Sequence, residues 1–407
     1  MRAGLLAVGI AAGVAAGGPA LAQMKGAPEI VAKRQMHITA SLDILYDTNI
    51  SHTSEAAAAL RGIHPEDEVV TPYAAIDIVQ PIGRNAAFLQ GNAGYDFHGE
   101  NHRLNRENID LTGGGLLSTG PCKTTGYGRF ASQQSDLLDT SLAVVSNQTQ
   151  TATGGGQIAC GKQRGLNLQL QGSHTDVVNS ETRQKLADHR ADDIGVSLGY
   201  ANERLGQIAL VYNYGQAYYP DRLNAKNTFG DSYWNQLLGI TITHQFGSKL
   251  KVQATGGQST VKRQSAPPNV PLKQTGFNYA AAVDYKLTNR LEFGLQAARQ
   301  FQPSNRPGKL YDLITHTEGT AKYQFGTRIT LTVGGFVEDL KANTDTAPNA
   351  LPTITKARRT NEYVTIRYRQ SDRLSALLDV RHEDRDTDVA LFNYSDTRAT
   401  LTLATSF

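Results

Sequence analysis

The chain has 407 residues, a formal net charge of +3, 39 glycines, 17 tyrosines and two cysteines. A net charge this small for this length argues against nucleic acid as a partner. No run of apolar residues after position 22 reaches the length of about 18 that a transmembrane helix requires. No break in composition follows residue 35, so one folded unit is expected from there on.

Residues 1–22 have the pattern of a secretory signal peptide. Arg2 supplies the positive start, Leu5–Ala16 an apolar run, and Ala20-Leu21-Ala22 the small residues of a cleavage site. We expect a mature chain that begins at Gln23, with a short periplasmic segment over 23–34 and one further domain over 35–407.

From residue 36 onward the chain alternates between apolar and polar side chains. Residues 36–46 show the pattern first, with His37, Thr39 and Asp43 between apolar neighbours. A period of two is typical of strands with two different faces. The alternating segments run to about 10–14 residues, longer than the 5–6 usual in soluble proteins and sufficient for a tilted strand to cross a bilayer.

Short turns and long polar loops alternate along the chain, which is the asymmetry of outer-membrane barrels. Eight turns and nine loops connect 18 strands; 16 strands follow if two weak ones fail, the weakest being residues 149–158. The predicted fold is all-β, a transmembrane antiparallel up-and-down β-barrel with both ends in the periplasm. The turns fall at 81–85, 119–125, 160–165, 202–206, 247–249, 288–290, 326–328 and 370–373, and the loops at 51–69, 99–105, 137–147, 176–190, 219–231, 261–273, 302–311, 341–357 and 383–390.

One short pattern recurs at five of the turns. It begins at residues 200, 244, 285, 323 and 368, and consists of an aromatic residue, a polar turn, Lys or Arg, and an aliphatic residue. We interpret it as a periplasmic hairpin whose aromatic ring lies at the membrane interface.

Two of the predicted loops carry further features. Residues 54–62 are expected to form a short helix capped by Ser54, lying on the surface or folded inward. The carboxylates of 383–388 are expected in a solvated loop, because the Gly and closing Glu of a Ca²⁺ loop are missing.

The two cysteines fall at the same end of neighbouring strands. Cys122 precedes the fifth expected strand and Cys160 ends the sixth, so both thiols lie at the periplasmic rim, within reach of a disulfide. Metal or catalytic use needs more ligands than the chain offers there.

Charged residues on the polar faces of the strands are the candidates for lining the lumen. The arginines come from the last three strands and the aspartates from the first four, and these strands become neighbours when strand 18 pairs with strand 1. Local salt bridges along one wall, or a charged track that guides a hydrated saccharide, both fit. The candidates are Arg367, Arg369, Arg381, Arg398, Asp43, Asp77, Asp96 and Asp110.

The chain contains none of the common catalytic or metal-binding motifs. We therefore expect no enzyme activity, no cofactor and no metal site.

The segment 45–50, LYDTNI, resembles the Y-D-x-N element near the start of an outer-membrane β-barrel porin family of proteobacteria that is associated with exopolysaccharide loci. The final strand, ending in Phe407, resembles the segment that the barrel-assembly machinery recognises. The resemblance implies an outer-membrane channel with a role in polysaccharide export. It assigns no catalytic residue, and it leaves open whether Asp47 and Asn49 bind a ligand or close a turn.

The function expected from these observations is an outer-membrane channel for polar solutes. Passage of polysaccharide or oligosaccharide follows from the resemblance; a general diffusion porin for small hydrophilic solutes, or a non-conducting scaffold or receptor, are the alternatives. The expected partners are outer-membrane lipid, the barrel-assembly machinery, polysaccharide and periplasmic export components, and no nucleic acid.

Overall fold

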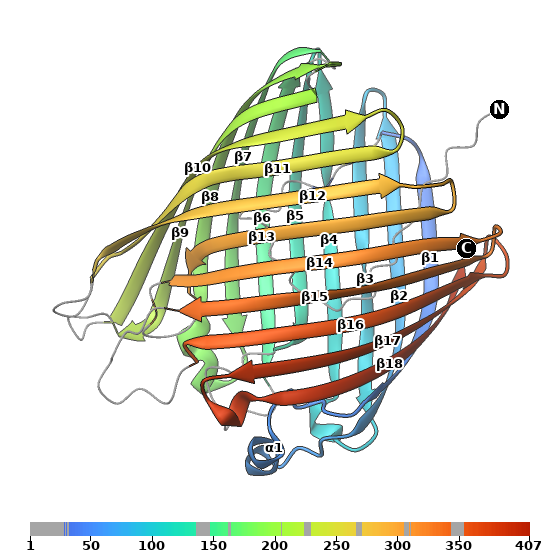
Figure 1. Cartoon of the computed structure of the whole chain (residues 1–407), viewed down its shortest axis with the longest axis vertical. Coiled ribbons are helices and arrows are strands. Elements are labelled where there is room, and N and C mark those ends of the chain that lie inside the picture. Colours follow the sequence, from blue (N-terminus) through green and yellow to red (C-terminus); the bar gives the residue numbers. More distant parts are fainter. Residues whose placement is uncertain are drawn as a thin grey trace.

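The described part of the chain folds into one closed β-barrel (Figure 1). The computed structural model describes residues 28, 30, 32–135, 147–161, 164–204, 206–223, 229–265, 271–304, 309, 311–342 and 354–407. The expected signal peptide and most of segment 23–34 lie outside these residues. No helix within the described ranges is long and apolar enough to span a membrane.

The barrel has 18 strands, so the prediction of 18 rather than 16 is confirmed. The weak segment 149–158 lies inside a regular strand, β6. The strands are β1 (Gln35–Asp47), β2 (Asp67–Ile82), β3 (Asn85–His98), β4 (Arg106–Thr119), β5 (Cys122–Gln134), β6 (Gln148–Gly161), β7 (Gly165–Asn179), β8 (His189–Asn202), β9 (Gly206–Leu223), β10 (Phe229–Phe246), β11 (Leu250–Arg263), β12 (Lys273–Lys286), β13 (Leu291–Pro303), β14 (Tyr311–Phe325), β15 (Ile329–Ala342), β16 (Lys356–Arg369), β17 (Leu374–Thr387) and β18 (Tyr394–Ser406).

The first and last strands close the barrel, along a line that we call the seam. β1 and β18 pair antiparallel from Thr39 with Ser406 to Asp47 with Arg398. The amide of Phe407 donates to the carbonyl of Ile38 at 2.8 Å, so the chain ends within the sheet. Closure leaves no unpaired sheet edge, which a sheet in lipid requires because the bilayer core offers no water to satisfy backbone groups.

The outer face of the barrel is apolar. The exposed large hydrophobic side chains fall at alternate positions, as β8 shows with Ile194, Leu198 and Tyr200 at 58%, 52% and 49% exposure. The residues between them face the lumen. In lipid, an apolar face of this kind is stable only when it points outward.

The recurring aromatic pattern lies where five strands end at short turns, as expected for the periplasmic hairpin. The rings are exposed on the outer face. At the strand ends this face meets the interface between membrane and water, which aromatic side chains favour. They are Tyr200, Phe246, Tyr285, Phe325 and Tyr368.

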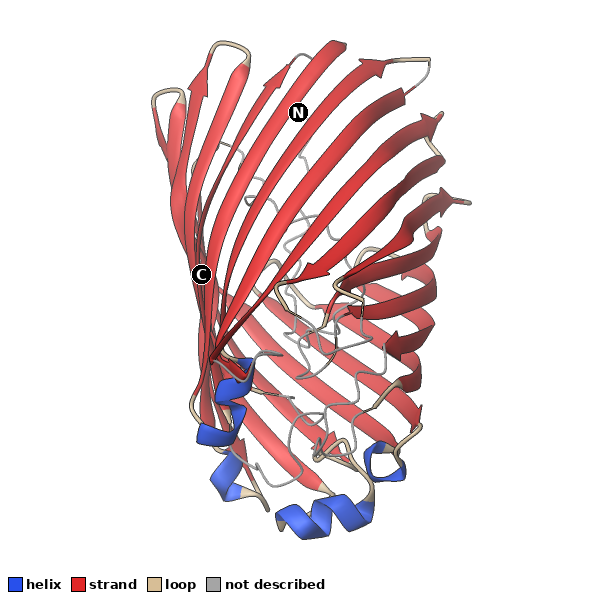
Figure 2. Ribbon diagram, turned by 90° about the vertical axis from the view of Figure 1, so that its left-hand side faces the viewer, coloured by secondary structure: helices blue, strands red, loops and turns tan. Residues whose placement is uncertain are grey.

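The helices among the described residues lie at the opposite end, which is the extracellular one (Figure 2). The helices are α1 (Glu55–Arg61), η1 (His102–Leu104), η3 (Thr182–Ala187) and η4 (Ala390–Phe392). Ser54 caps α1 as predicted, with its hydroxyl accepting from the amide of Ala57 at 3.3 Å, and Gly62 ends it with φ of 60°. Figure 1 shows α1 beyond the strand ends rather than within the lumen.

The prediction of an acidic loop over 383–388 was wrong. β17 continues to Thr387, and β18 begins at Tyr394 after η4. Glu383 therefore lies in the sheet with its side chain inward, only 5% exposed. The alternation of charged residues in this segment is the continuation of the strand pattern.

Cys122 and Cys160 are direct partners across β5 and β6. Their Cα atoms lie 4.0 Å apart and their sulfur atoms are bonded in the structure. The bridge lies beside the turn at Gly120, at the periplasmic end. It joins two strands that already pair along their length, so it reinforces a register that the backbone sets.

Candidate functional site

The inner face of the barrel is the candidate functional surface, and all eight charged residues predicted from the sequence lie on it. The arginine set and the aspartate set do not meet across the lumen. Instead, most members have partners on their own or an adjacent strand.

Two of the aspartates have close partners on neighbouring strands. Asp110 binds Arg129 of β5 through two contacts, Nε to Oδ1 at 2.8 Å and Nη2 to Oδ2 at 2.6 Å. Asp77 accepts hydrogen bonds from Gln35 and from Gln90, the latter at 2.9 Å.

The other two predicted aspartates lie near the seam. Asp96 accepts from the hydroxyl of Thr71 at 2.7 Å. Asp43 pairs with Thr402 of β18.

The predicted arginines divide into two kinds. Arg381 forms an ion pair with Asp379 two residues away on β17. Arg398 binds Asp396, with 2.8 Å between Nε and Oδ2. Arg367 and Arg369, near the periplasmic end of β16, form no ion pair with any residue that the structure describes, so they carry unpaired positive charge at that end of the lumen.

A band of charged side chains, of which the sequence predicted only Arg398, crosses the extracellular half of this wall. We call it the charged band. Neighbouring strands contribute one or two members each, and the members alternate between acids and bases. It consists of Glu318 and His316 on β14, Glu338 on β15, Arg359 on β16, Glu383 on β17, and Arg398 and Asp396 on β18.

Sheet register explains why these side chains meet. His316 is paired with Glu338, Glu338 with Arg359, and Glu383 with Asp396, so inward side chains stand directly opposite each other. Opposite charges at such cross-strand positions stabilise a sheet, whereas like charges destabilise it. Arg398 offsets the repulsion between Glu383 and Asp396.

Contacts along the charged band are continuous. His316 Nδ1 lies 3.5 Å from Glu338 Oε2, and Arg359 Nη2 lies 3.2 Å from Glu338 Oε1. Glu383 accepts hydrogen bonds from the Tyr394 hydroxyl at 2.6 Å and from Arg398 at 3.4 Å. The band therefore offers many hydrogen-bonding groups with little uncompensated charge.

The wall opposite the seam has a different interior. β10 lies nine strands from β1 in either direction around the barrel. There Tyr219, Tyr233, Val261 and Phe301 pack together, each between 0% and 4% exposed. We call this set the aromatic cluster.

Arginines cover the rings of the aromatic cluster. The guanidinium carbon of Arg222 lies 3.5 Å from the centre of the Tyr219 ring, a cation–π contact. Arg263 lies over Tyr233 and binds Asp231 at 3.2 Å. On this wall the guanidinium groups therefore pack against an apolar core.

A shallow groove lies on the outer wall over β4 to β7. Gly113 pairs with Gly128, and Gly128 pairs with Gly154, so a row of positions has no side chain. His174 and Asp176 line the extracellular end of the groove, whose volume is about 470 Å³. It faces away from the lumen and takes no part in the inner surface.

Neither a protein-family model nor a curated protein matches the chain in sequence. Similarity appears only among solved structures. A BenF-like porin from Pseudomonas fluorescens Pf-5 aligns with 93% of this chain and 100% of its own, with 13% identity and a TM-score of 0.51. The outer membrane protein OpdK from Pseudomonas aeruginosa, solved with vanillate, aligns over 92% and 99%, with 9% identity and a TM-score of 0.51.

An iron transporter has a similar structure too. The FrpB iron transporter from Neisseria meningitidis aligns with 88% of this chain but only 62% of its own, with 10% identity and a TM-score of 0.52. At such low identities the likeness shows the fold. The chain is a bacterial outer-membrane β-barrel. Its apolar outer face, closed sheet and polar inner face give the physical reason for this placement.

Proposed function

We propose that the barrel is a channel for polar solutes, and that its solutes are oligosaccharides or segments of polysaccharide. The observation that carries the proposal is the charged band. Its acids and bases compensate one another, so the wall provides hydrogen-bond donors and acceptors while the electric field across the lumen stays weak.

A neutral, polyhydroxylated solute suits such a wall. Each hydroxyl both donates and accepts, so a saccharide can exchange its water for carboxylate, guanidinium and tyrosine groups as it moves. An ion gains little from a wall of paired charges, because the pairs cancel at a distance.

A general diffusion porin for small hydrophilic solutes is the second candidate. The unpaired Arg367 and Arg369 favour it, because their positive charges near the periplasmic end of the lumen would attract small anions. A sealed scaffold or receptor is the third reading, and it predicts no conductance at all.

The family resemblance supports a role in polysaccharide export, with periplasmic export components as partners. The final strand supports recognition by the barrel-assembly machinery: its terminal Phe407 is 75% exposed on the outer face while its amide is fixed to β1. We therefore propose both periplasmic export components and the barrel-assembly machinery as partners.

The test is solute flux through liposomes carrying the purified barrel. Oligosaccharides of increasing length are compared with a monosaccharide, an amino acid and a small anion of similar size to the monosaccharide. We expect oligosaccharide uptake faster than size alone predicts, together with discrete conductance steps in planar bilayers. Flux that depends on size only would favour the general porin, and absence of both signals would favour the scaffold.

Two neighbouring residues supply matched variants. Thr365 faces inward, with its hydroxyl donating to Asp379 at 2.6 Å, and Val364 faces outward with 39% exposure. Thr365→Trp should slow saccharide flux, and Val364→Trp should leave it unchanged. Equal effects of the two variants would show that transport does not follow this wall of the lumen.

A further inference from the structure

The loop after β1 folds back onto the start of β18 and forms a compact polar turn at the seam. The amide of Asn49 donates to Asp47 Oδ1 at 2.7 Å, and the Asn49 side chain donates to the carbonyl of Thr53 at 2.9 Å. Thr48 links the turn to β18, because its hydroxyl accepts from the amide of Thr397 at 2.8 Å. The Asp-Thr-Asn sequence therefore fixes the path of the loop.

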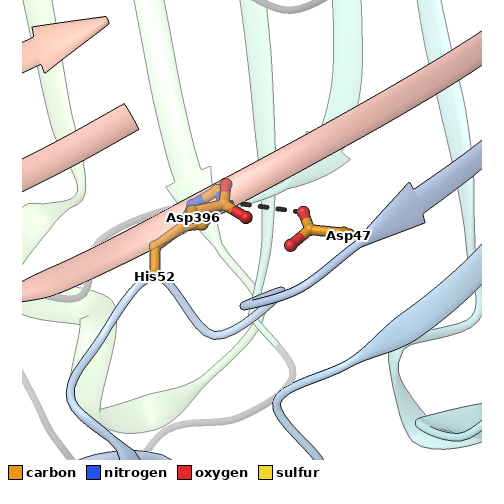
Figure 3. A group of neighbouring side chains, drawn as sticks. All are labelled: Asp47, His52 and Asp396. Carbon is orange, nitrogen blue, oxygen red and sulfur yellow. Dashed lines mark ion pairs between the residues drawn. The ribbon is translucent and has the colours of Figure 1, made fainter. Parts of the chain in front are cut away.

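This turn brings His52 between two carboxylates from opposite ends of the chain (Figure 3). Nε2 of His52 lies 3.8 Å from Oδ2 of Asp47 and 3.6 Å from Oδ2 of Asp396. Both aspartates are only 1% exposed. The three ligand atoms lie within 4.8 Å of one another.

Each aspartate uses its other oxygen to hold the loop. Oδ1 of Asp47 accepts from Asn49, and Oδ1 of Asp396 accepts from the Thr48 hydroxyl at 3.3 Å. Oδ2 of Asp396 accepts no hydrogen bond from the described residues, although Arg398 Nε lies 2.8 Å away. A buried carboxylate oxygen is thus directed at the same point as the imidazole nitrogen.

The separations fit ligands of one ion better than direct hydrogen bonds. At 3.6 and 3.8 Å, the nitrogen and the oxygens are beyond the range of about 2.7–3.2 Å for a hydrogen bond. Two ligand atoms bound to Zn²⁺ at about 2.1 Å lie about 3.4–3.6 Å apart when the angle is tetrahedral or somewhat wider.

The backbone of His52 is also held in an unusual conformation. Its φ is 47°, and no other non-glycine residue that the structure describes has a positive φ. This left-handed region costs a residue with a side chain about 1 kcal/mol or more, and such residues often occur at ligand sites. Here the conformation turns the imidazole toward both carboxylates.

We propose that Asp47, His52 and Asp396 bind a divalent transition-metal ion such as Zn²⁺, with water completing the coordination. One imidazole and two carboxylates suit such an ion, whereas Ca²⁺ and Mg²⁺ prefer oxygen ligands alone. Arg398 lies beside the ligating oxygen of Asp396, where it can orient the carboxylate. The ion joins the first loop to the last strand and so fastens the seam.

The experiment uses the full barrel, purified in detergent, stripped with a chelator and titrated with Zn²⁺ by calorimetry and with Co²⁺ by visible absorption. We expect one ion per chain and a higher unfolding temperature with Zn²⁺. Removing one ligand should weaken binding at least about 10- to 100-fold, the loss typical of even an outer-shell partner.

Two variants remove ligands with little change in shape. Asp396→Asn keeps the volume of the side chain, and His52→Asn suits the left-handed backbone, which asparagine adopts readily. Both variants are first checked for barrel formation by circular dichroism.

A matched control comes from the outer wall. His174 also contacts two carboxylates, Asp192 at 2.7 Å and Asp176 at 3.2 Å, but through different ring nitrogens, so these do not share a point. His174→Ala should leave affinity and stoichiometry unchanged.

Three results would overturn the proposal. They are absence of binding in the wild-type barrel, full affinity in folded His52→Asn, and an equal loss in His174→Ala. Transport of saccharides is measured separately, so failure of the channel proposal leaves this one standing.

Discussion

The charged band, on β14 to β18, and the aromatic cluster, on β9 to β13, occupy adjoining parts of the same wall, both in the extracellular halves of their strands, and different interactions stabilise them. In the band, Glu383 is 5% exposed and contacts a tyrosine hydroxyl and two arginines. In the cluster, Tyr233 is 0% exposed and packs edge-on against Tyr219, with ring centres 5.7 Å apart. The band depends on complementary charge and the cluster on shape.

This difference shows how an aqueous barrel can carry buried side chains on its inner face. Charges removed from water are stable only when paired and hydrogen-bonded. Aromatic rings need no partner charges, but they need close packing. Substitutions that remove a charge but keep the shape of the side chain should therefore destabilise the charged band. Substitutions that change the shape of a side chain should destabilise the aromatic cluster.

The largest expected effect is that of Glu383→Ala. Removing this carboxylate leaves Arg359, Arg398 and the Tyr394 hydroxyl without their shared partner. Loss of one member of a buried charge set typically costs about 3–5 kcal/mol, so the free energy of unfolding should fall by about that amount. Urea unfolding of the barrel in lipid vesicles measures it.

Two controls separate charge from position. Glu383→Gln keeps an acceptor for Tyr394 and should cost less than the alanine variant. Asp384→Ala changes the next residue, whose side chain is 56% exposed on the outer face, and should stay within about 0.5 kcal/mol of wild type. If Glu383→Ala matched Asp384→Ala, the charged band would contribute nothing to stability.

Tyr233→Ala tests the aromatic cluster. Truncating a buried aromatic side chain leaves a cavity, and we expect a loss of about 3 kcal/mol. Tyr233→Phe should cost little, because the Tyr233 hydroxyl makes no hydrogen bond with the described residues. The neighbouring Trp234, the one tryptophan of the chain, reports unfolding by fluorescence. A phenylalanine variant as unstable as the alanine variant would mean that this cluster, too, depends on polar contacts.

The sequence predicted the architecture well because the signals for it are local. Turn residues and a period of two mark strand ends and strand faces, and all eight turns lie where they were expected. The same rule placed Asp110 and Arg381 on the inner face. What it could not provide was their partners, since pairing across strands depends on register between distant segments.

Glu383 shows the limit most clearly. Its segment, EDRDTD, has the composition of a loop, and only the pairing of β17 with β16 and β18 makes it a strand. The group Asp47, His52 and Asp396 was also beyond reach, because it forms only when the two ends of the barrel meet. Asp47 and Asn49 stood out by resemblance alone, and the structure shows them closing the turn.

A smaller effect is expected from the one part of the charged wall that lacks partners. Arg367→Gln removes an unpaired charge from the inner face. A unit charge about 6 Å from a passing ion in water contributes about 0.7 kcal/mol, which corresponds to about a threefold change in permeability. The cation-to-anion permeability ratio, obtained from reversal potentials in planar bilayers, should therefore rise about threefold. Arg358→Gln, on the outer face of the same strand, should cause no shift, and equal shifts would place the selective charge elsewhere.

The smallest effect concerns the loop that closes the charged wall at the extracellular end. Both oxygens of Asp388 accept from the amide of Thr355, at 3.0 and 3.1 Å. Burial alone would raise the pKa of Asp388, but hydrogen bonds from Thr355 and from backbone groups outweigh it and lower the pKa below 3.8. A lowered pKa means that the ionised carboxylate stabilises the loop at neutral pH, and that this contribution declines as the pH falls past 3.8 and through the lowered value.

Hydrogen exchange of the Thr355 amide measures this contribution directly. Protection, corrected for the intrinsic exchange rate, should decrease as the pH is lowered from neutral, by less than about tenfold because an exposed hydrogen bond contributes about 1 kcal/mol. Asp388→Asn should show the reduced protection at every pH, whereas Asp386→Asn, two residues earlier on the outer face, should behave as wild type. Protection that stays constant with pH in the wild-type chain would show that the sheet alone holds the backbone of the loop. The loop would then resemble the aromatic cluster, where packing rather than charge fixes the structure.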